Sequence, residues 1–158
     1  VHKIDSPECI KEDLSEFSGG DAGNFNIISM WHVLEHVPNL LEYIEKLKEL
    51  LTQDGYLIVA VPNFKSHDAV HYKEFWAAYD VPRHLWHFSE KSIRHIFGQH
   101  DFDVVKTLPL IFDSFYVSLL SEKYKTGKSN LISGFITGLT SNIKARHSGE
   151  FSSKIYLP

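Results

Sequence analysis

The chain lacks the residues that several classes of protein require. Its 158 residues include a single cysteine, Cys9, which excludes an intramolecular disulfide and a cysteine zinc cluster and fits a reducing cytosol. Every apolar run is far shorter than a membrane span, and no segment resembles a signal peptide, so we expect a cytoplasmic protein without membrane contact. No Gly-x-Gly sequence occurs, and the cluster Gly19–Gly23 opens no helix, so it fails as a nucleotide-binding turn.

Neither sign of charge dominates the chain. It has 16 basic and 20 acidic residues, a formal net charge of −4 and no basic run, so nucleic acid is not expected as an obligatory partner. A hydrophobic share of 43% at this length is enough for one sizeable core. We therefore treat residues 1–158 as a single domain or most of one.

Residues 25–63 predict one complete βαβ unit. Asn26–Met30 is a short apolar run, as expected of a strand covered on both faces, and Tyr56–Val61 is a second such run. Between them Asn39 is placed to cap a helix, and Gly55 is placed to end it with a positive φ. The helix carries one apolar stripe at helical spacing: Leu40, Leu41, Ile44, Leu47, Leu50 and Leu51. A helical crossover between two strands implies parallel pairing.

The flanking regions give weaker signals. Before the βαβ unit, either Glu8–Phe17 is a short helix or Cys9–Leu14 is a strand, and the sequence does not decide between them. After it, residues 64–88 form an aromatic, polar insertion without clear periodicity. A helix is expected from a Ser89 cap to about Phe97, with Phe88 and Ile93 as its hydrophobic staple. The other expected elements are a strand Phe102–Thr107, helices Asp113–Tyr124 and Ser129–Ala145 separated at Gly127, and a strand Phe151–Leu157.

Three phrases of the sequence carry a family resemblance. They are F-N-I-I-S-M-W-H-V-L-E-H-V-P-N at 25–39, L-L-T-Q-D-G-Y-L-I-V-A-V-P-N at 50–63 and V-P-R-H-L-W-H-F-S at 81–89. Together they resemble the second half of class I S-adenosylmethionine-dependent methyltransferases of the ubiquinone-biosynthesis-like type. Asn26 stands where that family commonly has Asp, and Gln53-Asp54-Gly55 replaces its Pro-Gly-Gly. The resemblance implies a Rossmann-like α/β fold with strand order 3-2-1-4-5-7-6 and an antiparallel strand seven.

The resemblance also implies a cofactor and a reaction. S-adenosylmethionine would donate a methyl group to a small-molecule acceptor. The family's Gly-rich turn after strand one, which binds the cofactor, has no counterpart in this chain, so we expect a domain that is incomplete at its N-terminus. Two missing βα units would amount to roughly 60 residues. The isolated chain is then expected to be inactive, or to act only as a binding or assembly module.

Candidate site residues gather where the expected strands end, because ligands of open α/β sheets lie outside the carboxyl ends of strands. Histidine is suited to proton removal near neutral pH. The candidates for proton transfer are His32, His36, His84 and His87; for cofactor contact Met30, Trp31 and Asp13; and for the acceptor Glu35, Trp76, Tyr79, Asp80, Arg83 and Trp86. The helical stripe Phe115, Tyr116, Leu119 and Leu120 is expected in the core or at a protein contact.

Three further patterns have competing interpretations. His32-x-x-Glu35-His36 matches an inverted zinc-peptidase motif, but Pro38 follows too soon for the helix that the motif needs, so we expect no metal from it and keep a zinc hydrolase only as a remote alternative. Gly134-x-x-x-Gly138 is expected to pack helices closely in a soluble domain. If strands one and two are absent, the Asn26–Met30 edge is open and favours self-association.

Overall fold

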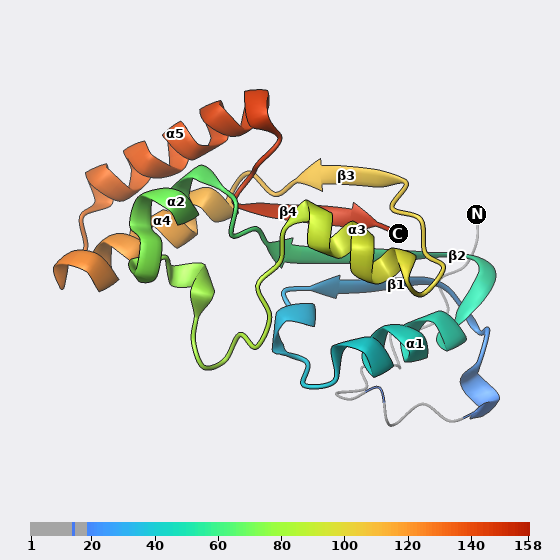
Figure 1. Ribbon diagram of the computed structural model, residues 1–158. Coiled ribbons are helices and arrows are strands. Elements are labelled where there is room, and N and C mark those ends of the chain that lie inside the picture. Colours follow the sequence, from blue (N-terminus) through green and yellow to red (C-terminus); the bar gives the residue numbers. More distant parts are fainter. Residues whose placement is uncertain (1–13, 15–18) are drawn as a thin grey trace, which may run out of the picture.

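The computed structural model describes Leu14 and residues 19–158, and these form a four-stranded sheet with helices along one face and at one end (Figure 1). The sheet order is β1-β2-β4-β3, with β1 (Phe25–Trp31) parallel to β2 (Leu51–Pro62). β4 (Ser153–Leu157) is antiparallel to both β2 and β3 (Lys106–Pro109). This is the order and direction expected for strands 4-5-7-6 of the Rossmann-like methyltransferase sheet.

The βαβ unit is confirmed, although its second turn differs from the expectation. α1 (Leu40–Leu50) follows Asn39, whose side chain makes no capping hydrogen bond. Gly55 does not end the helix and has no positive φ, because β2 begins directly at Leu51. The pairing jumps from Phe25 opposite Leu51 to Ile27 opposite Tyr56, so the intervening residues of β2 bulge out. A Cβ on Gly55 would lie 2.9 Å from Leu51 Cδ2, which explains the glycine at this bulge.

The main core lies between the sheet and helices α1 and α3 (Glu90–Gly98). The α1 stripe is buried except for Leu41, which is 53% exposed, so the expected stripe was one residue too wide. α3 begins as expected at Ser89, where Ser89 and Ser92 form a capping box and Phe88 and Ile93 are both buried. This core holds the carboxyl end of β1 in place.

A second core lies beyond the carboxyl ends of β1 and β2, where helices gather at one end of the sheet (Figure 1). It joins α2 (His67–Tyr72), the 3₁₀ turns Lys73–Phe75 and Ala77–Tyr79, and α4 (Asp113–Thr126). α5 (Leu131–Ser148) packs on α4 through Gly134 and Gly138, where an added Cβ would lie 2.9 Å from the α4 backbone. Close packing of two helices thus explains the Gly-x-x-x-Gly spacing.

The remaining differences from the sequence expectations are at strand boundaries. The expected strand Phe102–Thr107 enters the sheet only at Lys106, and the last strand begins at Ser153 rather than Phe151. The helix after Gly127 starts at Leu131, with Asn130 as its cap. The alternatives for Glu8–Phe17 lie outside the described residues, apart from Leu14, which packs against the main core.

One face of β1 is open among the described residues, contrary to the expectation of a strand covered on both faces. Met30 points into the core, whereas Ile27 is 62% and Trp31 is 51% exposed. β1 is also the terminal strand of the sheet, pairing only with β2 in the part of the chain that the structure describes. None of the described helices is long and apolar enough to cross a membrane.

Candidate functional site

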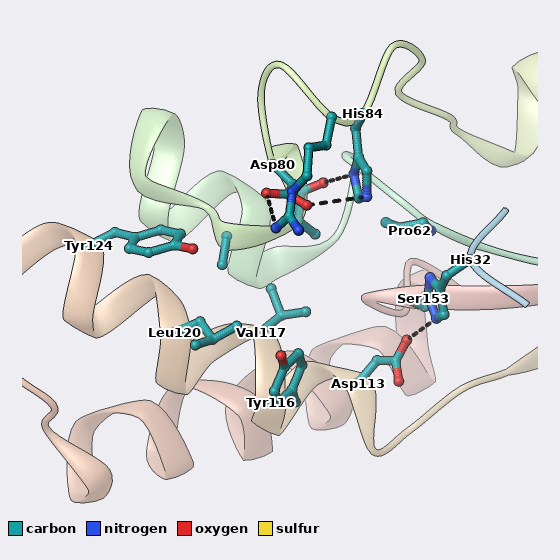
Figure 2. Close-up of a pocket in the computed structure, with 13 residues that line it drawn as sticks. His32, Pro62, Asp80, His84, Asp113, Tyr116, Val117, Leu120, Tyr124 and Ser153 are labelled. Atoms are coloured by element: carbon teal, nitrogen blue, oxygen red, sulfur yellow. Dashed lines mark hydrogen bonds and ion pairs between the residues drawn. The ribbon is translucent and has the colours of Figure 1, made fainter. Parts of the chain in front are cut away.

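A cavity of about 350 Å³ lies where β1 and β2 end and α4 begins (Figure 2). Its polar lining comes from four places: His32 after β1, the loop from Asp80 to His84, Asp113 at the start of α4, and Ser153 at the start of β4. Tyr116, Val117, Leu120 and Tyr124 of α4 form an apolar and aromatic wall. The position outside the carboxyl ends of parallel strands is the usual ligand site of such sheets.

His32 is the most constrained residue of this cavity. Its backbone has a φ of 53°, in the left-handed region that residues other than glycine rarely adopt, and its N–H donates to Ala60 O at 2.9 Å. Such backbone strain is found preferentially at functional sites. The turn places the imidazole between two carboxylates. Nδ1 lies 3.1 Å from Glu35 Oε1, and Nε2 lies 2.9 Å from Asp113 Oδ2 (Figure 2).

These two carboxylates change the protonation of the ring. Hydrogen bonding to Asp113, and secondarily to Glu35, raises the pKa of His32 from 6.5 to about 9, against the opposing effect of burial. At neutral pH His32 is therefore an imidazolium that donates through both nitrogens. In this arrangement the ring is not a free base, and Asp113 is the group that presents acceptor oxygens to the cavity.

The loop from Asp80 to His84 forms the opposite wall. Asp80 has a φ of 38° and accepts a hydrogen bond from Arg83 Nη2 at 2.8 Å. His84 Nδ1 donates to the Ala78 carbonyl at 2.8 Å, which fixes the tautomer because a carbonyl can only accept. Desolvation by burial lowers the pKa of His84, which favours the neutral ring. The loop thus brings one acidic, one basic and one neutral polar group to the cavity.

Glu35 and His36 lie on the single 3₁₀ turn Leu34–His36, not on a sustained helix. Glu35 is 1% exposed, and its Oε2 has no hydrogen-bond partner among the described residues. His36 Nδ1 donates to the Arg83 carbonyl at 3.1 Å, and its ring meets that of His84 edge-on at 4.6 Å. His32 and His36 therefore have different partners, and the turn that carries Glu35 and His36 is as short as the early Pro38 led us to expect.

Several predicted aromatic site residues lie outside the cavity lining. Trp76 is buried in the second core and donates its Nε1 to Asp68 at 2.8 Å. Tyr79 stacks edge-on between Trp76 and His87, and His87 Nε2 donates to the Tyr79 carbonyl at 3.0 Å. Trp86 donates to the Val37 carbonyl at 2.7 Å and borders a separate hollow beside α1. Of the predicted acceptor-side residues, Asp80 and Arg83 line the cavity.

The predicted cofactor-side residues occupy the end of β1. The Met30 side chain is buried on the core side of β1, and the Trp31 side chain is exposed on the opposite face. Asp13 lies outside the described residues. Sequence reasoning missed Asp113 and Tyr124 and assigned Tyr116 to the core or a protein contact. The one available signal was the acidic residue opening the α4 pattern, which is also a common feature of ordinary helix N-termini.

Comparisons with known proteins add independent findings. A family described as "Methyltransferase domain" matches residues 2–107. A search of curated proteins gives no match. The fold is similar to that of a SAM-dependent methyltransferase from Archaeoglobus fulgidus, with a TM-score of 0.54 and 13% identity over 94% of this chain and 65% of that one.

Two further solved structures share the fold. A possible histamine N-methyltransferase from Thermotoga maritima gives a TM-score of 0.53 and 16% identity over 87% of this chain and 56% of that one. Phosphoethanolamine N-methyltransferase 2 from Haemonchus contortus gives a TM-score of 0.52 and 9% identity over 92% of this chain and 35% of that one. The chain thus spans less than two thirds of the length of each of these proteins.

Proposed function

The chain belongs to the methyltransferase-domain family, and on that premise we propose that it serves S-adenosylmethionine-dependent methyl transfer to a small-molecule acceptor bound beside His32. The observation that carries the proposal is the position of His32. Its backbone is strained, its ring contacts both Glu35 and Asp113, and it lines the cavity beyond the carboxyl end of β1. A volume of about 350 Å³ suits a small molecule. A cytoplasmic location, expected from the single cysteine, is part of this proposal.

The end of β1 offers a surface for the methyl donor. S-adenosylmethionine, when bound, supplies a methyl group on a sulfonium sulfur. Trp31 fits such a ligand because its indole is exposed at the carboxyl end of the strand, one residue from His32, and Met30 supports the strand from the core side. Two structures of phosphoethanolamine N-methyltransferase 2 from Haemonchus contortus, which shares the fold, are described in complex with S-adenosylhomocysteine and with S-adenosylmethionine, and this supports the choice of cofactor.

In this proposal Asp113, held in place by His32, receives the proton that the acceptor loses. Asp113 accepts a hydrogen bond from the O–H or N–H of the acceptor, and the His32 imidazolium holds that carboxylate in place. Of the four predicted histidines, His32 and His84 line the cavity, whereas His36 and His87 donate to backbone carbonyls of the neighbouring loop. Asp80, Arg83, Tyr116 and Tyr124 then orient the acceptor and exclude water.

The experiment is a transfer assay with radiolabelled S-adenosylmethionine and a panel of small amines, phenols and carboxylates, using the full-length protein that contains this chain. Label should pass to at least one acceptor, and D113N should slow the transfer by about 10²- to 10⁴-fold while leaving binding of the methyl donor intact. Transfer that is unchanged in D113N would contradict the assignment of the cavity.

A second candidate function is that of a binding or assembly module without activity of its own. The absence of a Gly-x-Gly turn from the sequence favours this for the isolated chain, because that turn approaches the cofactor in the resembling family. Within the described residues β1 pairs with β2 alone and exposes Ile27 and Trp31, and this surface suits such an assembly. Calorimetric titration of S-adenosylmethionine into the full-length protein separates the two, since the methyltransferase binds the cofactor and a module without activity binds it very weakly or not at all.

A further inference from the structure

The turn after β1 and the loop before α3 bring three metal-binding side chains together. One ligand atom each from Glu35, His36 and His84 lies within 4.8 Å of the others. Glu35 and His36 are neighbours in the turn Leu34–His36, whereas His84 comes from the distant loop that follows Asp80. A carboxylate with two imidazoles is a donor set typical of Zn²⁺ and of other divalent transition ions.

The hydrogen bonds of both histidines leave the same nitrogen available. His36 Nδ1 donates to the Arg83 carbonyl at 3.1 Å, and His84 Nδ1 donates to the Ala78 carbonyl at 2.8 Å. Each ring therefore carries its proton on Nδ1 and its lone pair on Nε2. Metal-bound histidines almost always donate their second ring N–H to a carbonyl or carboxylate in this way, because the bond fixes the tautomer and the ring orientation.

The third side chain carries an unsatisfied buried oxygen. Glu35 is 1% exposed, and its Oε1 accepts from His32 Nδ1 at 3.1 Å. Its Oε2 has no hydrogen-bond partner within the described part of the chain. Leaving a buried charged oxygen unpaired costs about 1–3 kcal/mol or more, so this atom points to a ligand.

The backbone holds these groups in place without a ligand. The N–H groups of Leu85 and Trp86 donate to the Glu35 carbonyl at 2.8 and 3.3 Å, and Trp86 Nε1 donates to the Val37 carbonyl at 2.7 Å. These bonds tie the turn to the loop. The Asp80 carboxylate lies 3.8 Å from His84 Nε2, but it already accepts a hydrogen bond from Arg83.

We propose that Glu35, His36 and His84 form a binding site for one divalent transition-metal ion, with Zn²⁺ as the ion that suits the donor set best. The site differs from the H-x-x-E-H motif of the sequence, for which no metal was expected. It uses His84 from a distant loop in place of His32, which is occupied between Glu35 and Asp113. Bound metal would fasten the turn after β1 to the loop that walls the cavity, and this role does not depend on methyl transfer.

The test is Zn²⁺ titration of the chelator-treated protein in competition with a chromogenic chelator, followed by Co²⁺ absorption spectroscopy. We expect one Zn²⁺ per chain and cobalt bands of a site with nitrogen and oxygen ligands. E35Q, H36Q and H84Q should each weaken Zn²⁺ binding by more than roughly 10- to 100-fold. That range is the typical cost of losing a residue that only hydrogen-bonds a metal ligand, whereas these three would bind the metal directly. H95Q is the matched control, because His95 is exposed on α3 and should leave the affinity unchanged.

Two results would overturn the proposal. One is the absence of stoichiometric Zn²⁺ and Co²⁺ binding to the unmodified protein. The other is unchanged binding in H36Q, which would assign the ion to other histidines such as the neighbouring pair His67 and His71. Because His36 is exposed, H36Q should fold even if substitution of the buried Glu35 does not, and circular dichroism of each variant checks this.

Discussion

His32 Nε2 lies 2.9 Å from Asp113 Oδ2, so the carboxyl end of β1 is joined to the first residue of α4 across the cavity (Figure 2). This contact connects the two cores of the molecule. β1 belongs to the sheet and its covering helices, whereas α4 belongs to the helical layer at the end of the sheet. A ligand in the cavity therefore touches both, and the pair fixes the distance between them.

The first prediction concerns this pair. In the full-length enzyme, D113N should lower kcat by about 10²- to 10⁴-fold, the range that a positioned acid or base contributes. H32Q should lower it less, because glutamine can still hydrogen-bond Asp113 but supplies no charge. The control is D103N, since Asp103 is exposed and lies outside the cavity lining. Steady-state kinetics measure the effect, and equal loss in D103N would contradict the site.

The second prediction concerns stability in the α1 stripe. L47A should lower the free energy of unfolding by about 2–5 kcal/mol, because Leu47 is 1% exposed and its removal leaves a cavity against the sheet. L41A should change it by less than about 0.5 kcal/mol, because Leu41 lies on the solvent side. Urea denaturation of both variants compares two leucines of the same helix. Similar losses of unfolding free energy in the two variants would show that α1 does not bury its Leu47 face and expose its Leu41 face as described.

The third prediction concerns helix packing. G138A should destabilise the chain by about 1–3 kcal/mol, because its Cβ would lie 2.9 Å from Phe115 Cα and Ser114 O, and backbone atoms cannot move aside. G98A is the control: nothing lies within 4 Å of a Cβ there, so its effect should be neutral or slightly stabilising. Thermal unfolding distinguishes the two, and a harmless G138A would mean that α5 does not press on α4.

The fourth prediction concerns acid stability. The Lys154 ammonium is 2% exposed and lies 2.9 Å from Glu90 Oε2 and 3.1 Å from Glu150 Oε2. The hydrogen bond from Lys154 holds the pKa of Glu90 below its usual value of 4.5. A pKa that is lower in the folded state stabilises the fold above the unfolded-state pKa, and this contribution is lost as the pH falls through the folded-state value.

E90Q should accordingly be less stable than the unmodified chain at neutral pH, by roughly 1–2 kcal/mol, since Glu90 is partly exposed and Glu150 remains beside Lys154. The difference should shrink as the pH falls below about 4.5, where Glu90 takes up a proton in the unfolded state, and should vanish once it is also protonated in the folded state. Urea denaturation at a series of pH values measures this. E74Q, at an exposed glutamate, should show no such pH-dependent difference.

Local signals predicted the parts of the fold that depend on neighbouring residues. The Ser89 cap, the Gly127 break and the spacing of α1 are all determined within one or two helical turns. The Gly55 expectation failed because a glycine after a helix suits either a helix end or a strand bulge, and the pairing of β2 with β1 decides between them.

In the candidate site, too, the sequence predicted what depends on neighbouring residues and missed what depends on tertiary structure. His32, Asp80, Arg83 and His84 could be predicted because they follow the expected strands or belong to the phrase at 81–89. Asp113 could not, because its role depends on where α4 lies relative to β1, and three α-helices and two strands separate them in the sequence. The grouping of Glu35 and His36 with His84 depends equally on tertiary structure, through the backbone bonds from Leu85 and Trp86.

The last prediction concerns self-association through β1. In the described structure this strand has a neighbour on one side only, and Ile27 on its open face is 62% exposed. Unpaired N–H and C=O groups beside an apolar surface recruit other chains, so the 158-residue chain should form dimers or larger species at moderate concentration. I27K should shift sedimentation profiles toward the monomer, since a lysine on an edge strand opposes pairing. V105K is the matched control, because Val105 is equally exposed but donates its N–H to Leu157 beside the opposite edge of the sheet. A clean monomer at high concentration would show that this edge is covered, and equal effects of the two lysines would indicate general charge repulsion instead of a specific edge contact.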